Sequence, residues 1–126
     1  MSNWGTSDMY SNLKKVLLRT PTTVGNFVTD GAWREPDKTA LLKEHQDLAS
    51  LLKTFGAEVI VAPSIDGLVD SVYMHDPTIM TPHGAILLRM AKAIRSQEPN
   101  HFRKSLETLG VPILGQLTEP AFVDGG

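Results

Sequence analysis

Short apolar runs alternate with longer amphipathic stretches along the chain, which predicts alternating strands and helices. Residues 15–19 (KVLLR) form an apolar run that is too short for a helix and is followed by Thr20 and Pro21, so we expect a buried strand there. Residues 22–36 show no clean period and contain several turn formers, which predicts a long loop. The β-branched and apolar residues 58–63 (EVIVAP) predict a second strand.

Between the loop and the second strand, the pattern changes to the period of a helix. The recurring positions, four and three residues apart, are Leu41, His45, Leu48, Leu52 and Phe55. This spacing predicts a helix that turns these side chains toward the core along one face. Asp37 is placed to cap the N-terminus of the helix, and Gly56 is placed to end it.

The second half of the chain begins with the signals of a hairpin. Residues 70–80 (DSVYMHDPTIM) alternate apolar and polar side chains until a proline interrupts them, which predicts a strand with Asp70 and Asp76 at its two ends. The turn formers of residues 81–84 (TPHG) connect this strand to a second apolar run at residues 85–90. We therefore expect the two runs to pair as a hairpin.

A second helix and a last strand follow the hairpin. The apolar face of this helix is formed by Phe102, Leu106 and Leu109. The helix is expected to start near Pro99 and to end at Gly110, and residues 111–114 (VPIL) predict a strand. Each half of the chain thus resembles one strand-rich module with a single helix, as in a weak internal repeat.

Composition and charge narrow the class of protein. With 126 residues and 13.8 kDa, of which 41% are hydrophobic and 21% charged, residues 1–126 are expected to form a single domain. The 12 Lys and Arg are balanced by 14 Asp and Glu, so no excess of positive charge favours a nucleic-acid partner. No apolar run approaches the roughly 20 residues of a membrane helix, and the first ten residues do not resemble a signal peptide. We therefore expect a cytoplasmic protein without a membrane partner.

The sequence contains no cysteine. This excludes disulfides, thiolate metal sites and a thiol nucleophile supplied by these residues. We expect neither a metal ion nor a cofactor.

Three carboxylates stand in short motifs that could carry chemistry: Asp70, Asp76 and Asp124. Six residues of a straight strand would keep Asp70 and Asp76 on the same face but about 20 Å apart, too far to hold one small group together. Asp76, between a predicted strand and Pro77, is well placed to line the mouth of a pocket. The alternative is that Asp76 only caps a turn at the end of the strand.

The order of these motifs resembles the dimethylargininase and amidinotransferase family of the pentein fold. The motifs are GLVDSVYMHDPTIMTPHGAILLRM, then a helix, LGVPIL and FVDGG, together with YSNLKKVLLRTPT and LLKTFGAEVIVAP earlier in the chain. The resemblance implies an α/β fold, a partial pentein-type α/β propeller. It would contain about two ββαβ modules, approximately residues 10–65 and 68–116, and the first strand of a third.

The resemblance also implies a site for a small, arginine-like guanidino compound. In such enzymes carboxylates accept paired hydrogen bonds from the planar guanidinium group, which would make Asp76 and Asp124 the guanidinium clamps. Asp70 matches the first Asp of the motif and would support the site. Arg89 matches an arginine that can pair with the carboxylate of the substrate; the alternative is a solvent-exposed residue at a strand end.

The resemblance implies no catalytic residue in this chain. The histidine and the nucleophilic cysteine of the family follow the GG motif, so we expect a truncated chain that is inactive alone. His75 is not expected to replace that histidine, because it would point away from Asp76 on a strand. His45 is expected in the core, and His83 and His101 are expected to face water.

Three functions follow as alternatives. The first is a fragment of an enzyme that hydrolyses or transfers the guanidino or amidino group of arginine or a methylated arginine. The second is a non-catalytic, oligomeric interaction or small-molecule-binding module derived from that fold. The third, a translation-factor-like pentein that binds the ribosome, is disfavoured by the near-neutral charge and the acidic motifs. A homo-oligomer is expected because two modules would leave apolar flanks and strand edges uncovered.

Overall fold

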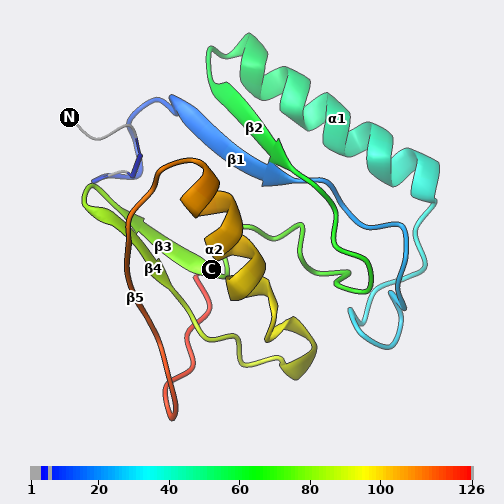
Figure 1. Cartoon of the computed structure of the whole chain (residues 1–126). Coiled ribbons are helices and arrows are strands. Elements are labelled where there is room, and N and C mark those ends of the chain that lie inside the picture. The colour runs from blue at the N-terminus through cyan, green and yellow to red at the C-terminus, as the bar shows by residue number, and fades with distance from the viewer. Residues whose placement is uncertain (1–3, 6, 126) are drawn as a thin grey trace. The chain divides into compact units, whose positions relative to one another are not determined.

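The computed structural model describes residues 4, 5 and 7–125. The described elements, in order along the chain, are β1 (Lys15–Arg19), α1 (Lys38–Thr54), β2 (Glu58–Ala62), β3 (Thr78–Thr81), β4 (Gly84–Leu87), the 3-10 helix η1 (Ala93–Arg95), α2 (Glu98–Thr108) and β5 (Ile113–Gln116) (Figure 1). The predicted α/β class is confirmed. The described part of the chain contains no helix long and apolar enough to cross a membrane.

The chain forms two compact units. The first unit runs from Asn12 to Tyr73, and the second contains the described residues up to Ser11 and those from Met74 onward. The single domain and the module limits at residues 10–65 and 68–116 stay predictions.

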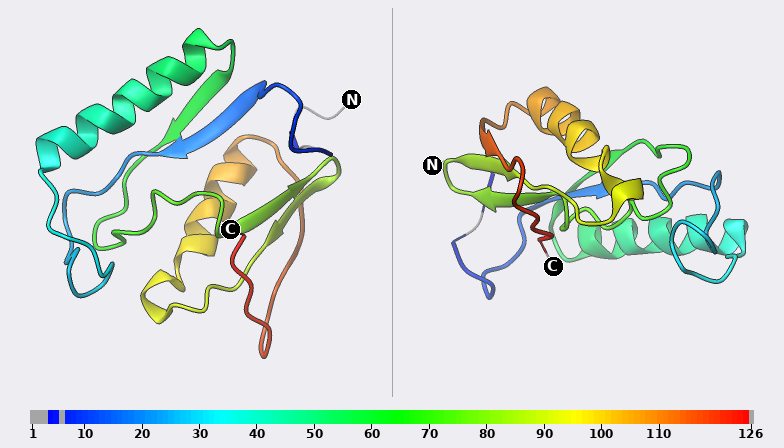
Figure 2. Two further views of the ribbon diagram at one scale, coloured as in Figure 1. Left: turned by 180° about the vertical axis from the view of Figure 1, so that it is seen from behind. Right: turned by 90° about the horizontal axis from the view of Figure 1, so that it is seen from below.

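The first unit is a β-α-β arrangement. β1 and β2 pair in parallel, with Lys15 opposite Glu58 and Arg19 opposite Ala62. α1 connects the two strands and lies alongside β2, as the left view of Figure 2 shows. Asp37 caps α1 as predicted, because its carboxylate accepts a hydrogen bond of 2.9 Å from the backbone N–H of Ala40.

The buried face of α1 differs from the predicted one. Leu48 is 45% exposed and Phe55 is 77% exposed, whereas Ala49 is buried. Leu41 and Leu52, on the predicted face, are half-buried. The stripe that faces the strands is therefore rotated toward Ala49, whose small side chain allows close approach. The predicted positions of Leu48 and Phe55 in the core were wrong.

The second unit is built on a three-stranded sheet in the order β3-β4-β5. β3 and β4 pair antiparallel across the predicted turn at residues 81–84, although the first strand of this hairpin starts only at Thr78. β5 pairs with β4 in parallel after the crossover through α2. α2 buries Phe102 and Leu106 as expected, while Leu109 is 37% exposed. β5 lies two residues later than predicted, because Val111 and Pro112 connect α2 to the strand.

The strand predicted over residues 70–76 was wrong. The chain turns repeatedly there, with backbone hydrogen bonds from Ser71 N–H to Leu68 O and from Tyr73 N–H to Asp70 O, both 3.0 Å. Bonds between residues three apart are incompatible with a strand, even though the side chains alternate in polarity. β3 begins only at Thr78, so Asp70 and Asp76 do not share the face of a strand.

Candidate functional site

The segment that follows β5 brings three predicted site residues into one unit. Arg89, two residues beyond the end of β4, forms an antiparallel bridge with Val123, whose N–H donates to Arg89 O at 3.0 Å. Gly125 N–H donates to Asp76 O, also at 3.0 Å. The two neighbours of Asp124 in the chain, Val123 and Gly125, are thereby held against the backbones of Arg89 and Asp76. The backbones of the three predicted site residues are therefore near one another, while the Asp124 residue is exposed.

The carboxylate of Asp76 already contacts the side chains of Arg95 and His75 in its own unit. Its Oδ2 accepts a hydrogen bond from Nη1 of Arg95 at 2.6 Å, and its Oδ1 lies 3.0 Å from Nε2 of His75. The Asp76 side chain is 14% exposed, while that of His75 is 62% exposed. Because each carboxylate oxygen can accept more than one hydrogen bond, these contacts orient Asp76 without exhausting its capacity.

Arg95 and Glu98 form a buried, bidentate ion pair behind Asp76. Nε and Nη2 of Arg95 donate to the two oxygens of Glu98, both at 2.8 Å. Burial opposes the charge of Arg95, but the hydrogen bonds and charges of Glu98 and Asp76 outweigh burial and raise the pKa of Arg95 above its ordinary value. The carboxylates of Asp76 and Glu98 therefore share one guanidinium group, that of Arg95.

Sequence reasoning missed Arg95 and Glu98. Their separation of three residues suits an ion pair at the start of α2, and this spacing is the only local signal. The contact that matters, between Arg95 and Asp76, joins residues 19 apart in the sequence and depends on the turn between β4 and α2. A side-chain pattern does not encode that turn.

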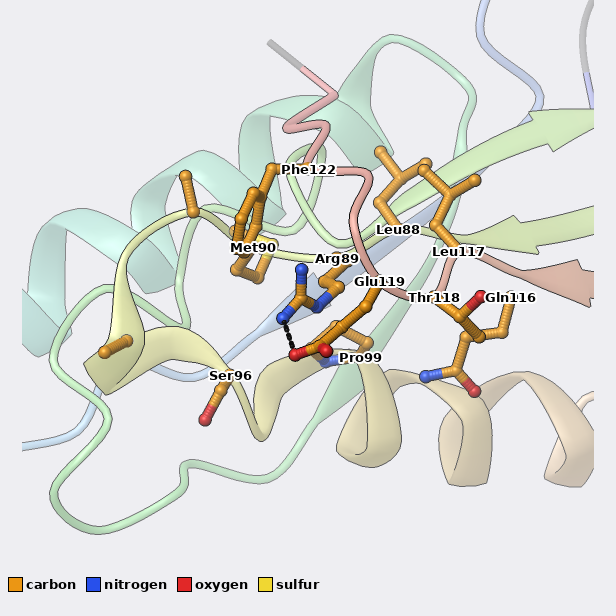
Figure 3. Close-up of a pocket in the computed structure, with 12 residues that line it drawn as sticks. Leu88, Arg89, Met90, Ser96, Pro99, Gln116, Leu117, Thr118, Glu119 and Phe122 are labelled. Carbon is orange, nitrogen blue, oxygen red and sulfur yellow. Dashed lines mark hydrogen bonds and ion pairs between the residues drawn. The ribbon is translucent and has the colours of Figure 1, made fainter.

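Arg89 lies in the wall of a pocket of about 540 Å³ (Figure 3). Its guanidinium carbon is 3.9 Å from the centre of the Phe122 ring, and its Nη2 donates to Oε1 of Glu119 at 2.8 Å. A guanidinium placed over an aromatic face is held by cation–π attraction. The predicted strand end was wrong, since β4 stops at Leu87, but the side chain does face a pocket.

Asp70 belongs to the first unit and anchors the long loop there. It is 5% exposed, and its Oδ1 accepts a hydrogen bond of 2.7 Å from Nε1 of Trp33. The rings of Trp33 and Tyr73 lie 5.9 Å apart at an angle of 36°. Asp70 therefore connects residues 22–36, predicted as a loop, to the turns that precede β3.

The histidines take different environments. Burial lowers the pKa of His45, and a hydrogen bond with the backbone of Arg19 only partly opposes this effect. His83 is exposed as expected, whereas His101 is half-buried at the start of α2, so the expectation that it faces water was wrong. His75 was expected to point away from Asp76 on a strand, which was wrong, since its Nε2 lies 3.0 Å from Asp76 Oδ1. That His75 is not catalytic stays a prediction.

Among the described residues, no group of three or more His, Cys, Asp or Glu side chains is close enough to hold a metal ion. The sequence-based expectations about metals and cofactors stay predictions.

Comparisons with known proteins show which fold the chain shares. No protein-family model matches the chain. The N(G),N(G)-dimethylarginine dimethylaminohydrolase of Pseudomonas aeruginosa is 23% identical over 114 residues, which cover 90% of this chain and 45% of that enzyme. A crystal structure of this enzyme, a mutant complexed with citrulline, matches 90% of the chain with a TM-score of 0.76 and 21% identity. The chain has the fold of part of dimethylarginine dimethylaminohydrolase.

Other solved structures give the same result. A dimethylarginine dimethylaminohydrolase adduct with 4-chloro-2-hydroxymethylpyridine matches with a TM-score of 0.75, 23% identity and coverage of 90% of this chain and 44% of that one. AgrE in a ternary complex with ornithine and NAD+ matches with a TM-score of 0.75 and 18% identity, covering 91% of this chain and 17% of AgrE. The predicted resemblance to dimethylargininases is confirmed. The chain spans less than half the length of the dimethylarginine dimethylaminohydrolase that it matches, and the propeller arrangement stays a prediction.

Proposed function

We propose that the protein binds the guanidino group of arginine or a methylated arginine, as part of an enzyme that hydrolyses or transfers that group. The observation that carries this proposal is the acidic cluster around Asp76, which already holds one guanidinium group, that of Arg95, in a hydrogen bond of 2.6 Å. The similarity to dimethylarginine dimethylaminohydrolase supports the same ligand chemistry.

Each proposed residue has a separate role. Asp76 and Asp124 accept hydrogen bonds from the N–H groups of the guanidinium, whose forked geometry suits carboxylates. Arg89 pairs with the carboxylate of an amino-acid ligand. A supporting role for Asp70, which accepts a hydrogen bond from Trp33 within the first unit, rests on its match to the motif alone.

Chemical turnover requires groups that these 126 residues lack. Attack on the guanidinium carbon needs an activated nucleophile, and the sequence contains no cysteine thiol. We therefore expect these residues alone to release no citrulline or ornithine from arginine above a buffer blank. Turnover that disappears in Asp76→Ala would show that a different nucleophile operates.

Calorimetric titration with arginine and agmatine tests the binding step. We expect affinities weaker than micromolar, because an open site leaves much of the ligand in water. Asp76→Asn and Asp124→Asn should each weaken both ligands about ten-fold, as expected for loss of a charge-assisted hydrogen bond. Glu107→Gln is the matched control, since it removes a carboxylate of the same unit that is exposed on α2. Equal affinities in all four proteins would refute the proposed clamps.

A further inference from the structure

The pocket beside Arg89 is lined by one positively and one negatively charged side chain. It is enclosed by residues 88–91, by the start of α2 and by the segment from Gln116 to Phe122 (Figure 3). Of the described residues that line it, Arg89 and Glu119 alone carry a charge, and they pair with each other. The other lining side chains are apolar or neutral. A ligand that enters this pocket therefore meets a guanidinium whose charge is already compensated.

The two partners are held to different degrees. The backbone of Arg89 is bridged to Val123, and its guanidinium lies over the Phe122 ring with Nη1 3.4 Å from Ala121 O. Its side chain is 28% exposed, whereas that of Glu119 is 84% exposed. Glu119 contacts Arg89 through Oε1. Arg89 is thus a fixed part of the wall, and Glu119 is a solvated group at the rim.

We infer that Glu119 is an intramolecular stand-in for the carboxylate of the ligand, and that an amino-acid ligand displaces it from Arg89. This inference rests on the proposed function for the identity of the ligand, and it adds Glu119 as a residue that determines specificity.

Displacement is favoured on three grounds. The released Glu119 returns to water at little cost, because an exposed ion pair stabilises weakly. A ligand carboxylate inside the pocket can present both oxygens to the forked N–H groups of Arg89. A ligand whose guanidinium is already bound at the acidic cluster also supplies its carboxylate at a high effective concentration.

The consequence is a selectivity that depends on the ligand's own charge. Glu119 competes with ligands that carry a carboxylate, such as arginine. It does not compete with agmatine, which has the guanidinium but lacks the carboxylate. Removing the charge of Glu119 should therefore raise the affinity for arginine but not the affinity for agmatine.

Calorimetric titration of Glu119→Gln with three probes tests this inference: arginine, agmatine, and norvaline, which carries the carboxylate without the guanidinium. We expect arginine and norvaline to bind about two- to five-fold more tightly than to the unsubstituted protein, the range for loss of an exposed ion pair. Agmatine should bind unchanged or slightly more weakly. Glu107→Gln, which removes the same charge outside the pocket, should leave all three affinities unchanged. Adding Arg89→Gln to Glu119→Gln should abolish the gain.

The outcomes that overturn the inference are distinct from those that overturn the proposed function. An unchanged or weaker affinity for arginine and norvaline in Glu119→Gln, or an equal gain for agmatine, means that Glu119 is not a stand-in. Failure of norvaline and arginine to bind Glu119→Gln at all has the same meaning. If agmatine alone failed to bind, the proposed guanidinium binding would be overturned. The norvaline affinities of the unsubstituted protein and of Glu119→Gln would still decide the role of Glu119.

Discussion

At the scale of single residues, the cluster of Asp76, Arg95 and Glu98 shows how the chain satisfies buried charge. Glu98 is 3% exposed and Arg95 is 8% exposed, so water contributes little to either group. A buried charge is tolerated when it is paired and hydrogen-bonded, and the planar fork of Arg95 reaches both carboxylates at once. The same contacts fix the orientation of Asp76, the proposed guanidinium ligand.

Substitution of Arg95 should therefore be strongly destabilising. Arg95→Met removes the guanidinium group that Asp76 and Glu98 share, and breaking a buried ion pair in this way costs about 3–5 kcal/mol. Urea denaturation followed by circular dichroism measures the change in the free energy of unfolding. Arg103→Met, at a partly exposed ion pair with Glu107, is the control and should cost less than about 1 kcal/mol. Similar losses in the free energy of unfolding in the two variants would mean that the buried ion pairs of Arg95 stabilise the fold no more than an exposed pair does.

His45 makes the stability of the fold depend on pH. Burial lowers its pKa in the folded protein below the ordinary value of 6.5, so near that pH the unfolded chain binds more protons than the folded one. The stability contributed by neutral His45 is then present above pH 6.5 and is lost as the pH falls below it. His45→Gln should make the thermal midpoint of unfolding depend less on pH between about pH 5 and pH 7.5. His83→Gln, at an exposed position, should leave the slope as it is; an equal flattening there would exclude His45 as its source.

At the scale of elements, the helix boundaries depend on interactions within a few residues. Asp37 caps α1, and Pro99 lies in the first turn of α2. The glycines that follow the two helices, Gly56 and Gly110, adopt φ angles of 91° and 72°, a region that other residues rarely enter. These local signals determine where each helix begins and ends.

Removal of the cap should destabilise the first unit measurably. Asp37→Ala loses the hydrogen bond to the N–H of Ala40, which costs about 1 kcal/mol at an N-cap. Glu44→Ala is the control because it removes an exposed carboxylate from the interior of the same helix. Chemical denaturation of both variants gives the comparison. If Glu44→Ala were the more destabilising of the two, the cap would not be what stabilises the start of α1.

The sequence predicted the elements better than the contacts between them. Both helices, the turn of the hairpin and the strand at residues 15–19 followed from periodicity and turn formers, because those signals act over a few residues. The strand over residues 70–76 failed, since alternating polarity does not reveal backbone hydrogen bonds that close turns. The pairs of Asp76 with Arg95 and of Arg89 with Glu119 join distant positions, and only the folded chain brings them together.

The final segment of the described chain is fixed to the site by a glycine. A Cβ atom at Gly125 would lie 2.1 Å from His75 O, so Gly125→Ala must move the segment away from Asp76. We expect this variant to weaken arginine binding several-fold with a small change in thermal midpoint. Gly115→Ala is the control, because nothing lies within 4 Å of its added Cβ atom. Calorimetric titration with arginine measures both variants. Equal affinities of Gly125→Ala and Gly115→Ala would mean that the position of Asp124 does not affect binding.

At the scale of the whole molecule, the two-stranded sheet of the first unit raises the question of assembly. Parallel strands are normally buried within larger sheets, yet in the described part of the chain β1 and β2 form a sheet without a third strand. Each strand therefore has one edge that makes no ladder hydrogen bonds within that sheet. Val61, in β2, is 44% exposed. Open strand edges and exposed apolar side chains invite pairing with another chain.

We propose on this basis that the protein forms a homo-oligomer, most simply a two-fold dimer, because closed two-fold assembly is the commonest arrangement. Light scattering after size-exclusion chromatography should give about twice the 13.8 kDa of one chain. Val61→Lys should shift the protein toward the monomer, since a charged side chain beside a strand edge opposes further pairing. Lys53→Ala, in the last turn of α1, is a control that changes charge away from the strands and should leave the mass unchanged. A sharp monomer peak with cooperative unfolding of the unsubstituted chain would show that it covers its own edges, and the oligomeric module would then lose its physical basis.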